Sequence, residues 1–216
     1  MKNINEMQGK TKGVKQLLQE KQIWAGLILA AGLSSRMGAF KPLLPLRGKT
    51  VLGCTVDSLL AAGVSEVTVV TGYRGEELEA YLSAHYGSNV RMIRNQQYRD
   101  SDMLASVRVG LTQMAPCAAF FLLPGDMPFV SKETLQALIR TRFATGSPLV
   151  FPELDGRRKH PPLIDAALIP QIQSYYGTDG LRGLWDSYQS VIRTVPVSDT
   201  GVGIDLDTEN DYVMYA

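Results

Sequence analysis

The regular alternation of short apolar, β-rich runs with amphipathic helical patterns most constrains what this chain can fold into. The runs EVTVVTG and AAFFLLPGD are continuous and rich in β-branched or aromatic residues, which is typical of strands buried on both faces. In RGEELEAYLSAHY the apolar side chains instead recur at three- and four-residue steps, as they do in a helix. This alternation predicts an α/β fold in which helices cover both faces of a mostly parallel central sheet.

The same patterns give approximate bounds for each element. The expected strands are Trp24–Ala30, Glu66–Thr71, Val90–Arg94, Ala118–Leu123, Leu149–Pro152, Val191–Val197 and Gly203–Leu206. The expected helices are Thr50–Ala62, Gly75–Ala84, Met103–Met114, Lys132–Phe143, Ala166–Tyr175 and Leu181–Tyr188. Residues 1–22 carry lysines but no apolar core segment, so we expect an N-terminal extension there. We expect one domain over residues 23–216, because no repeat or Pro/Gly linker divides it.

Polar or glycine-rich segments follow four of the expected strands. Leu29 leads into AAGLSSRMG, Val70 into TGYRG, Ile93 into RNQQY and Leu123 into PGDMP. In open sheets of this type, ligands bind beyond the carboxyl ends of the strands, near a switch in strand order. We therefore expect these four segments to converge on one edge of the sheet and to form the site.

The segment after the first expected strand, LILAAGLSSRMGAFKPLLP, suits a phosphate group. Gly32 lets the backbone approach a ligand closely, and the backbone N–H groups of such a turn can cradle an anion. Arg36 can grip phosphate oxygens as a fork, and Lys41 can act as a mobile point charge. The spacing fits neither the P-loop nor the dinucleotide-binding motif G-x-G-x-x-G. The alternative is an ordinary strand-to-helix loop with solvated cations.

Three aspartates are candidate metal ligands. Asp126 directly follows a buried strand between Gly125 and Pro128, and magnesium is often held by one or two carboxylates plus substrate phosphates. In GIDLDTENDY, Asp205 and Asp207 are two residues apart on an expected strand end, so they would share a face and repel unless a cation bridges them. The alternatives are a turn role for Asp126 and helix capping in DTEND.

Composition limits the partners. Lys and Arg total 22 against 21 Asp and Glu, so the net charge of +1 gives no reason to expect nucleic acid as a partner. No apolar window is long enough to span a membrane. Cys54 and Cys117 belong to no C-x-x-C pair, and buried free thiols suit a cytoplasmic location.

A resemblance adds to these inferences. LILAAGLSSRMGAFKPLLPLRGKTVL resembles the signature of the MobA/MocA-like nucleotidyltransferases, and more closely that of their molybdenum cofactor cytidylyltransferase branch. VTVVTGYRGEEL, NQQYRDSDMLASVRVGL, FLLPGDMPFVS, HPPLID and GIDLDTENDY follow in that family's order, so the resemblance runs from about residue 24 to 212. It implies a three-layer, Rossmann-like nucleotide-diphospho-sugar transferase fold. It also implies magnesium-dependent transfer of a nucleoside monophosphate from an NTP to a phosphorylated acceptor.

The resemblance also implies which residues are catalytic and which bind the metal, the acceptor and the nucleotide. The catalytic residues would be Arg36, Lys41 and Asp126, with Mg²⁺ on Asp126 and on Asp207 or Asp205. The acceptor would meet the basic run at Arg158, Lys159 and His160, although a solvated charge run is the alternative there. The nucleotide would contact Leu29, Ala30, Ala31, Gly32, Ser34, Ser35, Arg36, Met37, Gly38, Lys41, Thr71, Gly72, Asn95, Ser106, Pro124 and Gly125.

The favoured substrates are CTP and molybdopterin-bound molybdenum, with a molybdoenzyme as a possible client. Two enzymatic alternatives stay open, namely GTP as the nucleotide and a sugar- or polyol-phosphate as the acceptor. A hypothesis of another class is a non-catalytic chaperone that binds the finished cofactor and delivers it. The sequence departs from the family where a Gly is expected before Met103 and where Lys159 stands in the usual Gly-His-Pro.

Overall fold

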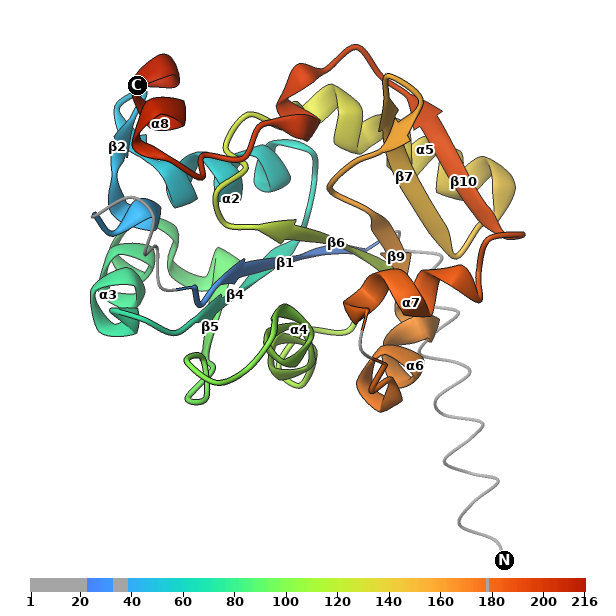
Figure 1. Cartoon of the computed structure of the whole chain (residues 1–216), viewed down its shortest axis with the longest axis horizontal. Coiled ribbons are helices and arrows are strands. Elements are labelled where there is room, and N and C mark those ends of the chain that lie inside the picture. Colours follow the sequence, from blue (N-terminus) through green and yellow to red (C-terminus); the bar gives the residue numbers. More distant parts are fainter. Residues whose placement is uncertain (1–22, 33–38, 178) are drawn as a thin grey trace, which may run out of the picture.

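A mixed sheet of eight strands forms the middle layer of the computed structural model, which describes residues 23–32, 39–177 and 179–216 (Figure 1). Its strands are β1 (Trp24–Ala30), β4 (Glu66–Thr71), β5 (Val90–Arg94), β6 (Ala119–Pro124), β7 (Leu149–Leu154), β8 (Arg157–Arg158), β9 (Leu163–Asp165) and β10 (Ile192–Pro196). Two further strands, β2 (Pro45–Leu46) and β3 (Lys49–Thr50), pair with each other as a separate hairpin.

The strand order β10-β7-β9-β6-β1-β4-β5 places the first strand in the interior of the sheet. β1 is parallel to both of its neighbours, β4 and β6, and β5 continues parallel to β4. β9 runs antiparallel between β6 and β7, so β7 and β10 again point the same way as β1. This mostly parallel sheet confirms the expected fold class.

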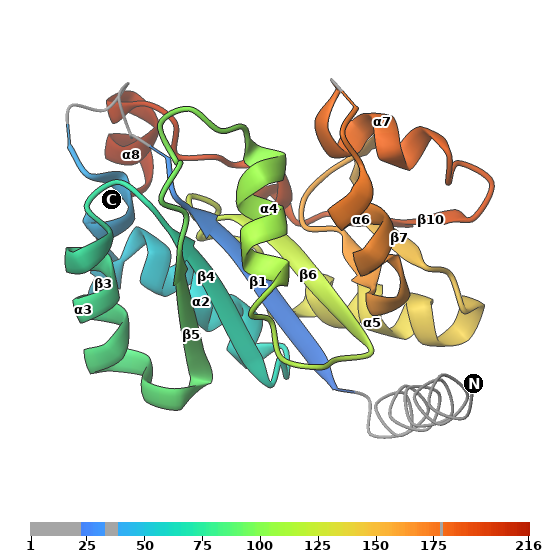
Figure 2. The ribbon, with the colours of Figure 1, turned by 90° about the horizontal axis from the view of Figure 1, so that it is seen from below.

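Helices cover both faces of the sheet, as Figures 1 and 2 show. One face carries α2 (Val51–Ala61), α3 (Gly75–Tyr86) and α5 (Lys132–Thr145), and the other carries α4 (Met103–Leu111), α6 (Ile169–Ser174) and α7 (Gly180–Asp186). The last helix, α8 (Glu209–Tyr215), lies beside the β2–β3 hairpin. Among these described segments, no helix combines the length and apolar character that crossing a bilayer requires.

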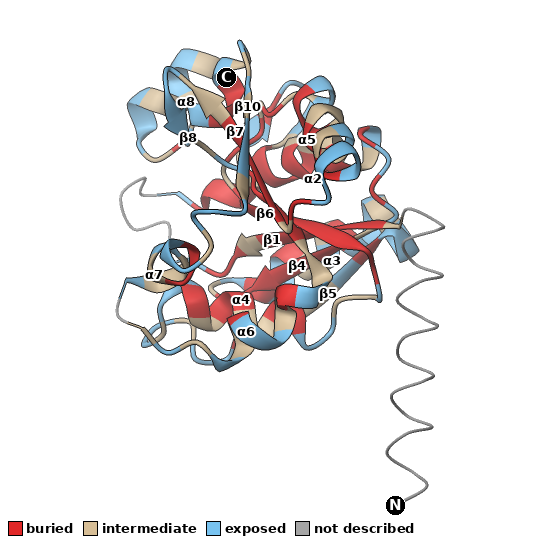
Figure 3. Cartoon of the chain, turned by 90° about the vertical axis from the view of Figure 1, so that its right-hand side faces the viewer, coloured by how far each residue is buried: buried red, intermediate tan, exposed pale blue. Residues whose placement is uncertain are grey.

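The alternating side chains of the central strands fill two separate cores. In β1, Ile28 packs with the α2, α3 and α5 side, whereas Leu27 packs with the α4, α6 and α7 side. β6 does the same with Phe121 and Phe120, and all four of these side chains are fully buried. Figure 3 shows this burial running along β1, β4 and β6. The continuous apolar runs therefore reflect burial on both faces.

Most of the expected bounds are confirmed. The expected ranges of β1, β4 and β5 match the structure residue for residue, and α2, α5, β6, β7, β10 and α7 begin and end within two residues of expectation. α4 ends three residues earlier than expected, and α6 is preceded by the short 3₁₀ helix η3 (Ala166–Leu168). The sequence patterns did not predict the short strands β2, β3, β8 and β9, because two or three residues are too few to show a period.

The expected strand at Gly203–Leu206 is wrong. The 3₁₀ helix η4 (Thr200–Gly203) comes first, and the chain then crosses the sheet edge without joining the sheet. Two contacts hold this segment in place. The Leu206 N–H donates a hydrogen bond to the Asp126 carbonyl at 3.1 Å, and the Leu206 side chain is buried. Apolar and acidic residues alternate from Ile204 to Asp207 as they would in a strand. The segment is irregular, however, and of these side chains only Leu206 is fully buried.

Both cysteines are free thiols, as expected, but their environments differ. Cys117 is buried, and desolvation raises its pKa to about 12. Cys54 is only partly buried, so the expectation of two buried thiols holds fully for Cys117 alone.

The contact between α4 and the centre of the sheet generates a stability prediction. A Cβ added at Gly110 would lie 2.4 Å from Leu27 Cδ1 and 2.7 Å from Val70 Cγ2. Gly110→Ala should therefore lower the unfolding free energy by about 1–2 kcal/mol, because overpacking outweighs the gain in helix propensity. Urea unfolding measures this, with the exposed Gln113→Ala as the control. Equal stability of the two variants would contradict this packing.

Candidate active site

The carboxyl ends of β1, β4, β5 and β6 meet at one edge, because these four strands are adjacent and parallel. The chain leaves β1 towards β4 on one side, and after β6 it continues on the other side, towards β9 and β7. β1 and β6 therefore flank the switch in strand order, with Leu29 paired to Pro124 at the edge. The four strands therefore end at one edge, as expected, and residues 33–38 of the first segment lie outside the described residues.

At this edge the Lys41 ammonium group joins two carboxylates from distant parts of the chain. Lys41 Nζ donates to Asp126 Oδ2 at 2.7 Å and to Asp207 Oδ1 at 3.0 Å. Lys41 belongs to the 3₁₀ helix η1 (Lys41–Leu43) and is only 9% exposed, which a lysine tolerates only when its charge is paired. Of the two candidates in the C-terminal segment, Asp207 is the one that joins this centre.

Asp126 has a rigid support and an unused oxygen. Gly125 N–H donates to the Leu29 carbonyl at 2.9 Å, and a Cβ at Gly125 would lie 3.2 Å from both Ala30 Cβ and the Leu29 carbonyl. This close fit holds the start of the Asp126 segment against β1. Asp126 Oδ1 is buried without a hydrogen-bond partner among the described residues. A buried carboxylate oxygen in that state is costly unless a cation reaches it.

Asp205 and His160 complete the electrostatics of the edge. Partial desolvation raises the pKa of Asp205, and the charges of Asp126 and Asp207 raise it further. Desolvation also lowers the pKa of His160, and the Leu122 carbonyl together with Asp205 and Asp126 only partly offsets this. The sign in both cases favours the neutral form. Burial therefore shifts His160 towards its uncharged form.

The expected base-pocket residues contact one another. Asn95 Nδ2 donates to Ser101 Oγ and Ser106 Oγ, both at 3.0 Å, and Thr71 Oγ1 donates to Glu79 Oε1 at 2.6 Å. A Cβ at Gly72 would lie 2.6 Å from the Ala31 carbonyl oxygen, so this glycine lets its loop press against the end of β1. These contacts organise the loops after β4 and β5, and contact of these residues with a nucleotide stays a prediction.

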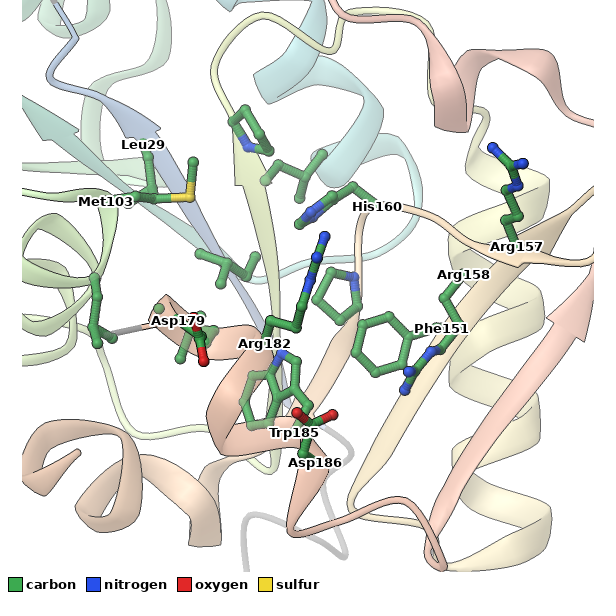
Figure 4. A pocket seen from close by; sticks show the side chains of 17 residues that line it. Leu29, Met103, Phe151, Arg157, Arg158, His160, Asp179, Arg182, Trp185 and Asp186 are labelled. Atoms are coloured by element: carbon green, nitrogen blue, oxygen red, sulfur yellow. The ribbon is translucent and has the colours of Figure 1, made fainter. Parts of the chain in front are cut away.

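A large cavity of about 700 Å³ lies between the ends of β1 and β6 on one side and α7 with β7 on the other (Figure 4). Most of its wall is apolar, for example Leu29, Leu122, Leu123, Phe151, Leu181 and Trp185. A smaller cavity of about 110 Å³ is lined by Ala30, Gly32, Lys41, Gly125 and Asp126, and Leu29 lines both. The large cavity therefore adjoins the Lys41 centre.

The expected acceptor residues are only partly brought together. His160 and Arg158 line the large cavity, and the Arg158 guanidinium lies 5.5 Å from the centre of the Phe151 ring. Lys159 does not line it, because its side chain instead lies beside Gly203. The two residues before it, Arg157 and Arg158, both line the cavity, so alternation along the chain does not by itself decide which of these side chains reach it.

Sequence reasoning missed Phe151, Arg182 and Trp185, which line the same cavity. No local pattern marks them, because they come from β7 and α7 and meet His160 only in the folded protein. Five other expected ligand contacts, at Ser34, Ser35, Arg36, Met37 and Gly38, lie outside the described residues.

The model of the MobA-like NTP transferase domain matches residues 26–191. The chain belongs to this family. It is thus a nucleotidyltransferase, as the resemblance implied. Residues 26–191 contain Lys41, Asp126 and His160, whereas Asp205 and Asp207 lie beyond the matched range.

Two relatives of this MobA-like transferase align over most of the chain. The molybdenum cofactor cytidylyltransferase of Escherichia coli (strain K12) is 30% identical over 193 residues, which cover 87% of this chain and 92% of the relative. The nicotine blue oxidoreductase of Paenarthrobacter nicotinovorans is 29% identical over 190 residues, covering 85% and 91%. These names belong to different reaction classes, so sequence identity at this level does not select a substrate.

Solved structures agree with the fold. A crystal structure from Mycobacterium tuberculosis H37Rv superposes with a TM-score of 0.76 at 27% identity, covering 89% of this chain and 97% of that one. A second structure from the same organism, in complex with manganese, has a TM-score of 0.71 at 27% identity and covers 90% and 97%. Enzymes of this family typically use a divalent metal.

The residues at the centre of this transferase fit a divalent ion that is shared with a substrate. In the described ranges, no three Asp, Glu, His or Cys side chains gather as a metal-binding group. Asp126 and Asp207 nevertheless share one cation, Lys41, and Asp126 Oδ1 lacks a partner among the described residues. Mg²⁺ and similar ions need few protein ligands when substrate phosphates and water supply the rest.

A metal ion bound by Asp126 and Asp207 would have to compete with Lys41 for the same carboxylates. Lys41→Met should tighten Mn²⁺ binding to the nucleotide-free protein by about tenfold or more, because a like charge about 4 Å away costs roughly 4 kcal/mol near a protein surface. Titration followed by electron paramagnetic resonance of free Mn²⁺ measures this without any turnover. Lys49→Met, whose lysine pairs with Asp57, is the matched control. Unchanged or weaker Mn²⁺ binding in Lys41→Met would contradict the competition.

Proposed function

We propose that this transferase moves CMP from CTP to the phosphate of a molybdopterin-type acceptor, with Mg²⁺, and releases pyrophosphate. The observation that carries the proposal is the centre formed by Lys41, Asp126 and Asp207, beside a small cavity that adjoins the large one. The name of the Escherichia coli relative supports the choice of nucleotide and acceptor.

The small cavity is the proposed site of the triphosphate. Gly32 and Lys41 line it, so a backbone turn and an ammonium group face the same small volume as the Asp126 carboxylate. Arriving phosphates would attract Lys41 away from Asp126 and Asp207, which frees both carboxylates. A divalent ion on these carboxylates would neutralise phosphate charge and polarise the reacting phosphorus. Arg36 is proposed to bind the leaving pyrophosphate together with Lys41.

The large cavity is the proposed site of the acceptor. The two cavities share Leu29, and Pro124 and Gly125 follow one another across the boundary between them. An acceptor phosphate at this boundary can therefore approach the α-phosphorus of the nucleotide, and the new P–O bond forms as the bond to pyrophosphate breaks. The protein positions the two phosphates and supplies charge, and this chemistry needs little else.

CTP is proposed as the nucleotide on the assumption that the base lies near Ala31 and Gly72, where the chain segments pack closely together. Ala31 is buried, its carbonyl would be 2.6 Å from a Cβ at Gly72, and Tyr98 lies close to the same glycine. A pyrimidine needs less room there than a purine. We further propose a cytoplasmic location and delivery of the product to a molybdoenzyme client, in line with the acceptor.

A pyrophosphate-release assay tests the function directly. The full chain is incubated with CTP, GTP, UTP or ATP and Mg²⁺, with and without molybdenum cofactor released from a molybdoenzyme, and with glucose 1-phosphate as the sugar-phosphate alternative. We expect acceptor-dependent release with CTP and the molybdenum cofactor. Release only with glucose 1-phosphate would replace the acceptor, and tight binding of CTP without turnover under any condition would favour the non-catalytic chaperone.

Asp126→Asn should lower the transfer rate by about a hundredfold or more, because loss of one preorganised charge at a reacting phosphate typically has this effect. The amide keeps the size of the side chain but removes the charge, so the fold should persist and circular dichroism should be unchanged. Glu133→Gln, exposed on α5, is the matched control. Wild-type turnover in Asp126→Asn would overturn the assignment of this carboxylate.

A further inference from the structure

We propose that Phe40 is a positioning residue for Lys41, and that Tyr73 and Arg74 hold its ring from the turn after β4 (residues 72–74). This inference rests on the proposed function, in which Lys41 leaves its two carboxylates and binds the phosphates of the nucleotide. It deepens that function, because it names the side chains that fix the position of the ammonium group. Phe40 itself is buried and is not expected to touch a substrate.

The first argument is the place of Phe40 in the chain. Phe40 directly precedes Lys41, and its carbonyl accepts a hydrogen bond from the Leu43 N–H at 3.1 Å. The Leu44 N–H donates in the same way to the Lys41 carbonyl, also at 3.1 Å. These bonds close the 3₁₀ helix η1, so the backbone at Lys41 follows any movement of Phe40.

The second argument is that two side chains of another segment hold the Phe40 ring. The ring meets Tyr73 edge to face, with 5.8 Å between the ring centres and 79° between the ring planes. The Arg74 guanidinium lies 4.8 Å from the centre of the Phe40 ring. Phe40 is only 5% exposed, so a ring held by an aromatic neighbour and a cation has little freedom to shift.

The third argument is that Arg74 is itself fixed. Its Nε donates to Glu77 Oε1 at 2.6 Å, and a second nitrogen of the same guanidinium pairs with the other carboxylate oxygen. Arg74 also adopts a left-handed backbone conformation, with φ of 49°, at the start of α3. That conformation costs energy for a residue with a side chain, so packing around the turn has to maintain it, and such positions concentrate at functional sites.

The same turn also supports the chain just after β1. The Tyr73 N–H donates to the Ala31 carbonyl at 3.5 Å, and a Cβ at Gly72 would lie only 2.6 Å from that oxygen. Ala31 is followed by Gly32, which lines the small cavity together with Lys41. The turn therefore supports both the glycine and the lysine that are proposed to receive the phosphates.

Positioning of this kind affects two ligands in opposite directions. With Phe40 in place, Lys41 pairs with Asp126 and Asp207 and lines the small cavity. A Lys41 without this support should bind phosphates less well, because its ammonium group is no longer preorganised. It should also leave the two carboxylates more often, so a metal ion should bind them more tightly. General damage to the fold would instead weaken both affinities.

Phe40→Leu tests this without any turnover, because it keeps an apolar side chain but removes the ring. Calorimetry measures binding of inorganic tripolyphosphate in metal-free buffer, and electron paramagnetic resonance measures binding of Mn²⁺ to the nucleotide-free protein. We expect tripolyphosphate to bind about tenfold more weakly. Mn²⁺ should bind about threefold more tightly, because the Lys41 charge then lies farther from the carboxylates. Phe121→Leu removes a ring from the same core on β6 and is the matched control for both affinities.

Two variants of Arg74 test the contact with the ring and leave Phe40 in place. Arg74→Met keeps the length of the side chain but loses the charge, so tripolyphosphate should bind about threefold more weakly. Arg74→Lys keeps a cation for the ring, and its affinity should lie within about twofold of the parent. Arg91→Met removes an exposed arginine from an ion pair with Glu66 and is the matched control. Equal affinities of Arg74→Met and Arg91→Met would overturn the role of Arg74.

A double-mutant cycle separates positioning from a direct effect on the ligand. In a Lys41→Met background, Phe40→Leu should change the tripolyphosphate affinity less than about twofold, because the side chain that it positions is absent. An equal loss in both backgrounds would overturn the inference. It would also be overturned if Phe40→Leu weakened both tripolyphosphate and Mn²⁺ binding, or changed neither. Thermal unfolding of each variant checks that the fold persists.

The same measurements keep this inference apart from the proposed function. If Lys41→Met weakens tripolyphosphate binding and Phe40→Leu does not, the inference fails while the proposed role of Lys41 stands. If Lys41→Met leaves tripolyphosphate binding unchanged, that role fails, whereas tighter Mn²⁺ binding in Phe40→Leu would still support the positioning of Lys41. Weaker tripolyphosphate binding together with tighter Mn²⁺ binding in Phe40→Leu supports both.

Discussion

The contact of one buried ammonium group with two carboxylates is the interaction on which the rest of the site depends. Lys41, Asp126 and Asp207 come from three separate segments, and the sheet edge brings them within hydrogen-bond distance. Two carboxylates this close would repel without a cation between them. In the protein without substrate, Lys41 serves as that cation.

This arrangement would link substrate binding to the charge of Lys41, because phosphates are proposed to bind the same ammonium group that pairs with Asp126 and Asp207. Within the described ranges no three Asp, Glu, His or Cys side chains gather as a metal-binding group, so a metal ion at this centre would need further ligands from a substrate or from water. In the proposed mechanism, nucleotide phosphates would compete for Lys41, and the two acids would then become available to a metal ion. Binding of the nucleotide and binding of the metal ion are therefore expected to favour each other.

The cavity beside this centre has a different character. Its wall is largely apolar, and the main polar groups come from α7 and from the segment that contains His160. The small cavity proposed for the triphosphate, which glycines and charged side chains line, thus adjoins a cavity lined mainly by aromatic and aliphatic side chains. Membership of the family indicates the class of reaction. The names of the two relatives describe different reactions, so they do not identify the second substrate. The residues that line this cavity are therefore the better guide to it.

The sequence by itself determined the layered fold, the edge where the site lies, and two of its charged groups. The bounds of β1, β4 and β5 could be predicted because strands buried on both faces consist of unbroken apolar runs, and Asp126 could be predicted because it directly follows such a run. The strand predicted at Gly203–Leu206 is wrong because the residues from Ile204 to Asp207 alternate between apolar and acidic, as in a strand, although the segment does not pair with the sheet. Only the tertiary structure decided that Asp207 rather than Asp205 meets Lys41, that Lys159 leaves the cavity, and that Arg182 and Trp185 enter it. The physical reason is that periodicity reports which face of an element is buried, whereas the partners of a polar side chain depend on how distant segments pack together.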